Sequence, residues 1–122
     1  MSSLAGFMVI LRRAKNKMMK NIFSDIPDNL PDELIELISE SKDVKIERIV
    51  SRGHTSPHDF WYDQEKNEFV FLVCGEARLR FEGEDELVQM KKGDYYFIPA
   101  HKRHRVEWTS PDNDTIWLAI HY

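Results

Sequence analysis

A histidine and a glutamate are the side chains best placed for chemistry. His104 opens a run in which His104, Val106 and Trp108 alternate with Arg105 and Glu107. Successive side chains of a β-strand point to opposite faces, so the first three share one face. Because this face carries valine and tryptophan, we expect it to be buried, with the charged neighbours turned to water. The alternation therefore predicts an imidazole that points inward at the start of a strand.

The glutamate, Glu68, opens the apolar run Glu68–Cys74. Both faces of this run are apolar apart from Glu68, as expected for a strand covered on both sides, so the pattern alone leaves open which face lines a cavity. A carboxylate in an apolar interior is costly to ionise unless a cation or a hydrogen-bond donor meets it. An inward imidazole is one such group, and a bound divalent metal is another.

The segment around His104 resembles the second conserved motif of the cupin superfamily, in which a glycine, a proline and a histidine follow at set spacing. Gly93, Pro99 and His104 match that motif. His101 stands where the family usually has a second glycine, and Trp108 stands where it often has asparagine. The resemblance covers roughly Val44 to Tyr122. It implies an all-β fold, the double-stranded β-helix or jelly-roll barrel.

Part of the first cupin motif is also present. Glu68 is followed after six residues by Gly75, but the His-x-His pair that precedes the glutamate in the family is missing, and residues 61–64 read WYDQ instead. In metal-binding cupins the site is built from that pair, the glutamate and the second-motif histidine. The resemblance therefore places Glu68 inside the barrel, opposite His104, and carries these two residues over as metal ligands.

The remaining ligands stay open. Counting back from Glu68 by four and six positions reaches Gln64 and Tyr62, whereas five and seven positions reach Asp63 and Trp61. A carboxylate such as Asp63 is a good hard ligand for Fe, Mn or Zn, and the Gln64 amide is a weak neutral one.

Two histidines upstream of this segment, His54 and His58, flank a turn and could replace the missing pair. We expect a divalent transition metal (Fe, Mn, Ni or Zn), with a ligand set drawn from Glu68, His104, Gln64 and Asp63. Tyr62 or His58 is the candidate general acid or base. The alternative is a Glu68–His104 ion pair in a barrel without metal.

The sequence is compatible with three functions. The first is a small metal-dependent enzyme, of the dioxygenase, isomerase or decarboxylase type, in which the metal holds the substrate at open coordination positions. The second is a binding module that holds a small molecule, and the third is a structural role. Fold alone does not choose among them, because one fold hosts many activities.

Composition places the chain among ordinary globular proteins. Its 122 residues are 42% hydrophobic and 31% charged, which fits one domain. The net charge of −4 gives no basic field for nucleic acid. The longest apolar run, Leu4–Leu11, is shorter than the roughly 20 residues of a membrane span. With one cysteine, Cys74, and no convincing signal peptide, we expect a cytoplasmic protein without membrane partners.

The chain divides into three predicted parts. Residues 1–20 are a basic, flexible extension, and Met18 or Met19 is a candidate internal start. Residues 21–43 form an arm with a short helix from Pro31 to about Ser39, since Leu34, Leu37 and Ile38 make one helical face. Residues 44–122 form the barrel, as short strands separated by turn signals.

Several residues have ordinary structural interpretations. His101 lies beside two basic residues and is expected at the surface, with the barrel mouth as the alternative. Cys74 is expected to be a buried small hydrophobe. Arg78 and Arg80 belong to a solvated charged face, and the tryptophans and Tyr62 are more often core than ligand platform. Because small cupins commonly pair through their sheets, the resemblance also implies a homodimer.

Overall fold

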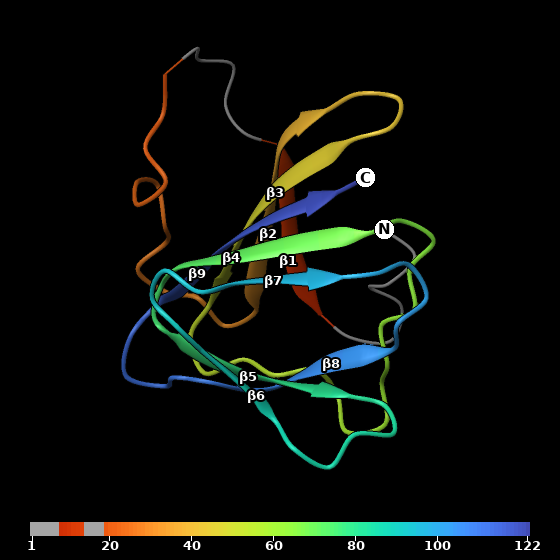
Figure 1. Cartoon of the computed structure of the whole chain (residues 1–122). Helices are drawn as coiled ribbons and strands as arrows, with labels where there is room; N and C mark the ends of the chain where they lie inside the picture. The colour runs from red at the N-terminus through yellow and green to blue at the C-terminus, as the bar shows by residue number, and fades with distance from the viewer. Residues whose placement is uncertain (1–7, 14–18) are drawn as a thin grey trace.

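Every regular element in the described part of the chain is a β-strand. The computed structural model describes residues 8–13 and 19–122, which contain nine strands and no helix (Figure 1). The strands are β1 (Val9–Arg13), β2 (Glu33–Glu40), β3 (Lys45–Ser51), β4 (Glu68–Cys74), β5 (Glu76–Phe81), β6 (Val88–Lys91), β7 (Tyr95–Ile98), β8 (His104–Thr109) and β9 (Thr115–His121). The all-β prediction is confirmed. Within the same residues, no helix exists that could cross a membrane.

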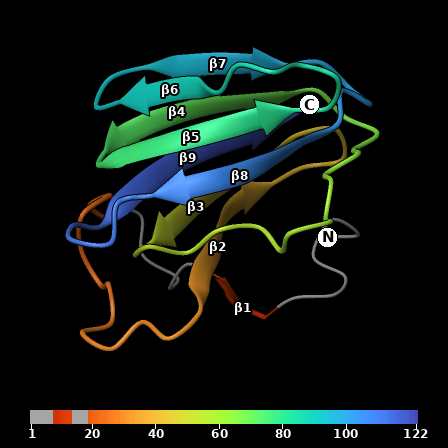
Figure 2. The same ribbon diagram turned by 90° about the horizontal axis from the view of Figure 1, so that it is seen from below.

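The strands form two sheets that face each other. The larger sheet has the order β1-β2-β3-β9-β4-β7 and the smaller one the order β6-β5-β8. Figure 2 shows the small sheet lying over the large one, and the chain passes from one layer to the other between β4 and β5 and at each connection from β6 to β9. Non-consecutive neighbours, such as β9 between β3 and β4, are the mark of a jelly roll rather than a simple meander.

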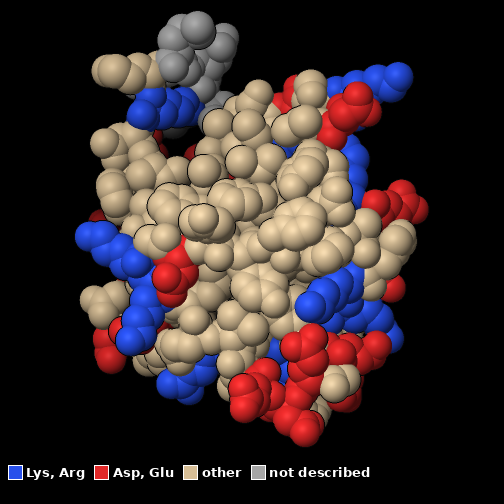
Figure 3. Space-filling model, in the orientation of Figure 1, with Lys and Arg blue, Asp and Glu red and all other residues tan. Residues whose placement is uncertain are grey.

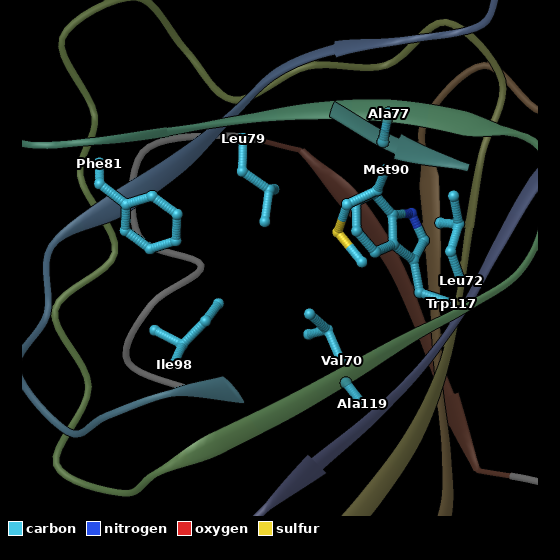
Figure 4. Close-up of a cluster of buried hydrophobic side chains, with 9 residues drawn as sticks. All are labelled: Val70, Leu72, Ala77, Leu79, Phe81, Met90, Ile98, Trp117 and Ala119. Atoms are coloured by element: carbon cyan, nitrogen blue, oxygen red, sulfur yellow. The ribbon is translucent and has the colours of Figure 1, made fainter. Parts of the chain in front are cut away.

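The hydrophobic core fills one end of the space between the sheets. Phe81, Leu79 and Ala77 of β5 meet Val70 and Leu72 of β4 from the opposite layer (Figure 4). All five are buried, and they alternate with outward residues along each strand. Glu68 and His104 open β4 and β8, so both candidate chemical residues lie on strands that pack against this core.

The predicted helix over residues 31–39 is wrong, because this segment is β2. It pairs parallel with β1 and antiparallel with β3, for example Leu34 opposite Val50 and Ile35 opposite Ile49. Leu34 packs on the outer side of the sheet with Leu30, while Ile35 points between the sheets. Sheet pairing on both sides and burial on both faces outweigh the helical spacing of the leucines.

The segment before β2 covers the outer face of the large sheet. Leu30 is buried there with Leu34 and Ile116. Arg48 of β3 donates hydrogen bonds to the carbonyls of Ile22 and Ser24, so this arm is anchored by a buried guanidinium. The arm therefore supports β3 from outside, opposite the face that lines the interior.

Part of the predicted extension is regular structure. Residues 9–13 form β1 at the edge of the large sheet, paired with β2. Residues 1–7 and 14–18 lie outside the described residues, and so does Met18, one of the two candidate start positions. Met19 is described and exposed.

Strand β8 departs from the simple alternation that its sequence suggests. The register against β5 shifts after Arg78, which lies opposite Trp108, whereas Leu79 lies opposite Val106. This bulge turns Trp108 to the outer face, where the Arg78 guanidinium lies 4.5 Å from the ring centroid. The prediction that Trp108 shares the inward face with Val106 is therefore wrong.

Arg105 also differs from its prediction. It was expected to face water, yet it is buried. Its guanidinium donates to the main-chain carbonyl of His58 and lies close to Glu107. These contacts hold the loop before β4 against β8, so a charged residue is used here as an anchor for the backbone.

Candidate functional site

A cavity of about 60 Å³ lies between the sheets, next to the hydrophobic core. That is several times the minimum volume for one buried water. Its walls are largely aliphatic, from Ile35, Ile49, Val70, Leu79, Ile98 and Val106. Against this apolar background, the polar lining side chains stand out as the candidate site.

Glu68 and His104 meet in this cavity, as predicted. Glu68 is the first residue of β4 and His104 the first residue of β8. Both side chains are more than nine-tenths buried, and His104 Nε2 lies 3.5 Å from Glu68 Oε1. This separation exceeds a normal N–H···O hydrogen bond of about 2.7–3.2 Å. Glu68 Oε1 has no hydrogen-bond partner among the described residues.

The other ring nitrogen of His104 fixes the role of Nε2. His104 Nδ1 lies 2.9 Å from the main-chain carbonyl of Lys102, and a carbonyl only accepts, so Nδ1 carries the proton. In the neutral ring, Nε2 then presents a lone pair to the cavity. A histidine whose second nitrogen donates to a carbonyl is the usual arrangement of a metal-ligating imidazole.

Tyr62 and Gln64 reach the cavity from the irregular segment before β4. The main chain of Tyr62 makes a two-way bridge with His104, with N···O distances of 2.7 and 3.2 Å. The two rings stack at 5.5 Å between centroids. Gln64 Oε1 is buried and has no hydrogen-bond partner among the described residues. The positions four and six before Glu68 are thus the ones that face the interior.

Asp63 and His58 do not reach the cavity. The Asp63 side chain is 47% exposed and its Oδ1 lies 2.8 Å from His101 Nδ1. The His58 side chain is 94% exposed, with Asp59 as its charged neighbour. The structure thus separates both from Glu68 and His104, because inward residues alternate along the segment and His58 lies on an outer loop. His54, the other upstream histidine, has its ring nitrogens near Arg52 N and Pro31 O.

His101 has a backbone conformation that suits the glycine it replaces. Its φ is 65°, in the left-handed region that few non-glycine residues adopt. Its main-chain N–H donates to the Gln64 carbonyl, and its ring contacts Asp63. His101 is therefore an exposed residue that fastens the segment carrying Tyr62 and Gln64, and not a ligand group of the cavity.

A second polar wall, not predicted from sequence, faces the same cavity. It consists of Glu33 of β2, Glu47 of β3 and His121 of β9. His121 Nε2 lies 3.0 Å from Glu47 Oε1, and both residues are buried. The Ser51 hydroxyl donates to Glu33 at 2.6 Å.

Strand alternation could have found two of these three residues. His121 shares the inward face of β9 with Trp117, and Glu47 shares the inward face of β3 with Ile49. Glu33 carried no such signal, because its segment resembled a helix.

Burial raises the pKa of two lining residues, Tyr62 and Glu33. It raises the pKa of Tyr62 well above its ordinary value, and the nearby carboxylates of Glu33, Glu68 and Glu47 raise it further. The phenol therefore stays protonated and can donate a hydrogen bond. Burial also raises the pKa of Glu33, although the Ser51 hydrogen bond and His54 oppose this effect.

The candidate metal ligands in the cavity wall suffice for a metal ion only if the Gln64 amide is counted with Glu68 and His104. Within residues 8–13 and 19–122, no three His, Cys, Asp or Glu side chains are arranged to hold a metal ion. Glu68 and His104 are two strong metal ligands, and Gln64 Oε1 is, with Glu68 Oε1, one of two buried acceptors in the cavity wall without a hydrogen-bond partner among the described residues. One imidazole, one carboxylate and one carbonyl oxygen suit a borderline divalent ion with open coordination positions.

The fold is that of the cupin domain family, to which the chain belongs: the family model for the cupin domain matches residues 48–121. The resemblance carried by Glu68, Gly75, Gly93, Pro99 and His104 is thereby confirmed. A comparison with curated proteins finds no match.

Several solved structures are similar to this chain. A protein described as a putative mannose-6-phosphate isomerase, from Ralstonia eutropha JMP134, is 44% identical, with a TM-score of 0.82 over 86% of this chain and 97% of that one. A cupin superfamily protein from Desulfitobacterium hafniense DCB-2 is 20% identical, with a TM-score of 0.64 over 79% and 82%.

An RmlC-like cupin family protein from Methanocaldococcus jannaschii has the double-stranded β-helix fold. It is 16% identical, with a TM-score of 0.62 over 80% of this chain and 85% of that one. At this identity the similarity concerns the fold alone, and it agrees with the jelly roll predicted from sequence.

Proposed function

We propose that this cupin holds one divalent transition metal in its barrel and binds a small molecule at the open coordination positions. The ligands are His104 Nε2, a Glu68 carboxylate oxygen and Gln64 Oε1. One observation carries the proposal: buried acceptor atoms of these side chains line one cavity, and neither Glu68 Oε1 nor Gln64 Oε1 receives a hydrogen bond from the described residues. Buried acceptors left without donors are costly, and a cation satisfies them together.

The chain's own residues define what such a site does. A divalent ion would supply Lewis acidity and positions for oxygen atoms of a ligand. Tyr62 would donate a hydrogen bond from its phenol to that ligand and so orient it. Because burial raises the pKa of this phenol, proton transfer from it is disfavoured, and Tyr62 is a weaker candidate for the general acid than for a hydrogen-bond donor. The aliphatic part of the wall offers no polar contact to water or to the ligand. Isomerisation of a small oxygen-rich molecule is the reaction type supported by the name of the 44% identical relative.

A metal-free binding module is the second candidate function. The Glu68–His104 contact at 3.5 Å supports it, because a protonated His104 would satisfy the buried carboxylate without a metal. The two candidates differ in one measurable property, the metal content of the purified protein.

The test is elemental mass spectrometry of untagged protein, for the wild type and three variants. We expect about one metal ion per chain in the wild type, with loss of metal in His104→Ala and Glu68→Gln. The matched control is His58→Ala, which removes an exposed imidazole and should leave the metal content unchanged.

Two results would contradict the metal proposal. One is a wild type that contains no metal and takes up none of Fe, Mn, Ni or Zn. The other is a metal content that falls equally in His58→Ala and His104→Ala. A metal-free protein that retains a small molecule, detected by mass spectrometry of the denatured sample, would instead support the binding module.

A further inference from the structure

We propose that the cavity selects an uncharged ligand bearing hydroxyl groups and disfavours anionic ligands, phosphate esters included. This inference rests on the proposed function, because it concerns the ligand of the same site. It differs from what the name of the 44% identical relative suggests, since that name specifies a sugar phosphate.

The first argument is the charge of the cavity wall. Three carboxylates line it, from Glu33, Glu47 and Glu68, and the lining residues among those described include no lysine or arginine. Phosphate recognition in proteins relies on guanidinium or ammonium groups or on clustered main-chain N–H donors. A single divalent ion bound by Glu68 would leave the two other carboxylates facing a phosphate group.

Nearby cationic side chains serve other contacts. Lys45 Nζ lies 3.9 Å from Glu47 Oε2, but Lys45 lines the neighbouring hollow beside β1 and β2 and not this cavity. Arg48 is turned to the outer face, where it pairs with Glu36. Arg52 is paired with Asp114 and donates to the carbonyl of Asp28. Arg48 and Arg52 thus have partners away from the cavity lining, and Lys45 approaches the lining through its ion pair with Glu47.

The second argument is the hydrogen-bonding capacity of the wall. A carboxylate accepts up to four hydrogen bonds. The Ser51 hydroxyl donates to Glu33, and His121 and Lys45 approach Glu47 at its two oxygens, so the two carboxylates keep acceptor capacity toward the cavity. Hydroxyl groups are donors that match this spare capacity. Glu68 Oε1 and Gln64 Oε1, which lack hydrogen-bond partners among the described residues, also indicate that the cavity binds a ligand.

The third argument is the shape and apolar character of the site. Ile35 and Ile49 lie on the same wall as the carboxylates, and Val106 and Leu79 face them from the small sheet. Aliphatic side chains pack against the C–H groups of a polyol, while carboxylates bind its hydroxyls. The cavity volume of about 60 Å³ exceeds what a single buried water needs, so there is room for part of a polyol beside these side chains.

The experiment compares matched neutral and phosphorylated probes by methyl NMR. Protein labelled at the isoleucine δ1 methyl groups is titrated with glycerol and with glycerol 3-phosphate, then with mannose and mannose 6-phosphate. Ile35, Ile49 and Ile98 report from the cavity wall. We expect saturable shifts of these methyls with a neutral probe, and affinity at least about tenfold weaker for its phosphate ester, which corresponds to about 1.4 kcal/mol.

Substitutions test whether the carboxylates cause the selectivity. Glu47→Gln should narrow the preference for the neutral probe by about tenfold, since it removes a negative charge from the wall. Glu33→Gln should narrow the preference in the same direction but by less, because burial already favours the protonated form of Glu33. Glu86→Gln removes an exposed charge distant from the lining and should change nothing. If Glu47→Gln unfolds because His121 loses its partner, Glu33→Gln, whose amide oxygen still accepts from Ser51, carries the test.

The results that would contradict the ligand preference differ from those that would contradict the metal site. A phosphate ester that binds the cavity as tightly as its neutral partner overturns the inference, and so does a failure of all four probes to shift the cavity methyls. The titrations are run on zinc-loaded and metal-free protein, with zinc measured directly. A protein that takes up no metal yet prefers the neutral probe contradicts the proposed metal site and supports the selectivity.

Discussion

At the residue scale, the site depends on a few polar side chains buried in an aliphatic cavity. Glu68 and His104 come from the starts of two strands, and Glu33 comes from a third. Burial makes the ionised form of a carboxylate expensive, so these positions influence stability as well as ligand binding. Glu33 shows this most directly, because burial raises its pKa.

Thermal unfolding at different pH values tests how the contribution of Glu33 to stability depends on pH. Since the pKa of Glu33 is higher in the folded protein, the folded state holds the proton more strongly. Its stabilising contribution is complete below the ordinary value of 4.5 and is lost as pH rises through the folded pKa. Glu33→Gln escapes this loss, so the Tm of the variant relative to wild type should increase as pH rises above 4.5.

The control for this comparison is Glu86→Gln, an exposed carboxylate. Its Tm should follow the wild-type profile across the same pH range. A Glu33→Gln profile parallel to that of the wild type would contradict the burial argument.

At the element scale, the turn between β4 and β5 limits how the two sheets meet. Gly75 has a φ of 89°, and a Cβ there would lie 2.5 Å from Thr115 Cα and 2.8 Å from the Asp114 carbonyl oxygen. Gly83, in the turn after β5, has a similar φ of 82° but no atom within 4 Å of such a Cβ. Comparing an alanine substitution at each position therefore distinguishes the cost of backbone strain from the cost of a steric clash.

We expect Gly75→Ala to destabilise the fold by about 3 kcal/mol or more, because main-chain atoms of β9 must move. Gly83→Ala should cost only about 1–2 kcal/mol, the strain of a left-handed alanine. In thermal unfolding this corresponds to a loss of roughly 10 °C against roughly 5 °C. Equal losses in the two variants would show that Gly75 is needed for its φ alone.

At the scale of the whole molecule, one face of the large sheet is largely without charge. Figure 3 shows few charged side chains over β4, β7 and β9, in contrast to the acidic group near the β5–β6 turn. Tyr95 and Phe97 of β7 are exposed, and each lies against a second aromatic ring, Phe69 or Tyr122. Exposed apolar patches of this kind mark interaction surfaces.

We propose that this face is the contact of a homodimer, since β7 is also an edge strand whose outer side has no partner strand in the described part of the chain. Light scattering coupled to size exclusion should give the mass of a dimer. Tyr95→Glu with Phe97→Glu should weaken association by tenfold or more, about 1.4 kcal/mol. The control is Gln89→Glu on β6 of the other sheet. A wild-type protein that is monomeric at every concentration would contradict this proposal.

Local sequence was sufficient to predict the barrel and to predict that Glu68 and His104 face the same cavity. The turn-separated strands after Val44, and the spacing of Glu68, Gly75, Gly93 and His104, depend on neighbours in the chain. Counting from Glu68 also gave Tyr62 and Gln64, but it could not choose them over Trp61 and Asp63. That choice is made by the bridge between Tyr62 and His104, a pairing of residues 42 positions apart (104 − 62).

Other features could be known only from the tertiary structure, because they depend on residues far away in the sequence. Residues 33–40 carry a helical spacing of leucines, and they become a strand because β1 and β3 pair with them. Trp108 leaves the inward face because β8 bulges against β5. Glu33, Glu47 and His121 form one wall because β2, β3 and β9 are neighbours in the sheet. Hydrophobic alternation determines which residues of a strand share a face, but only long-range pairing determines which strands share a cavity.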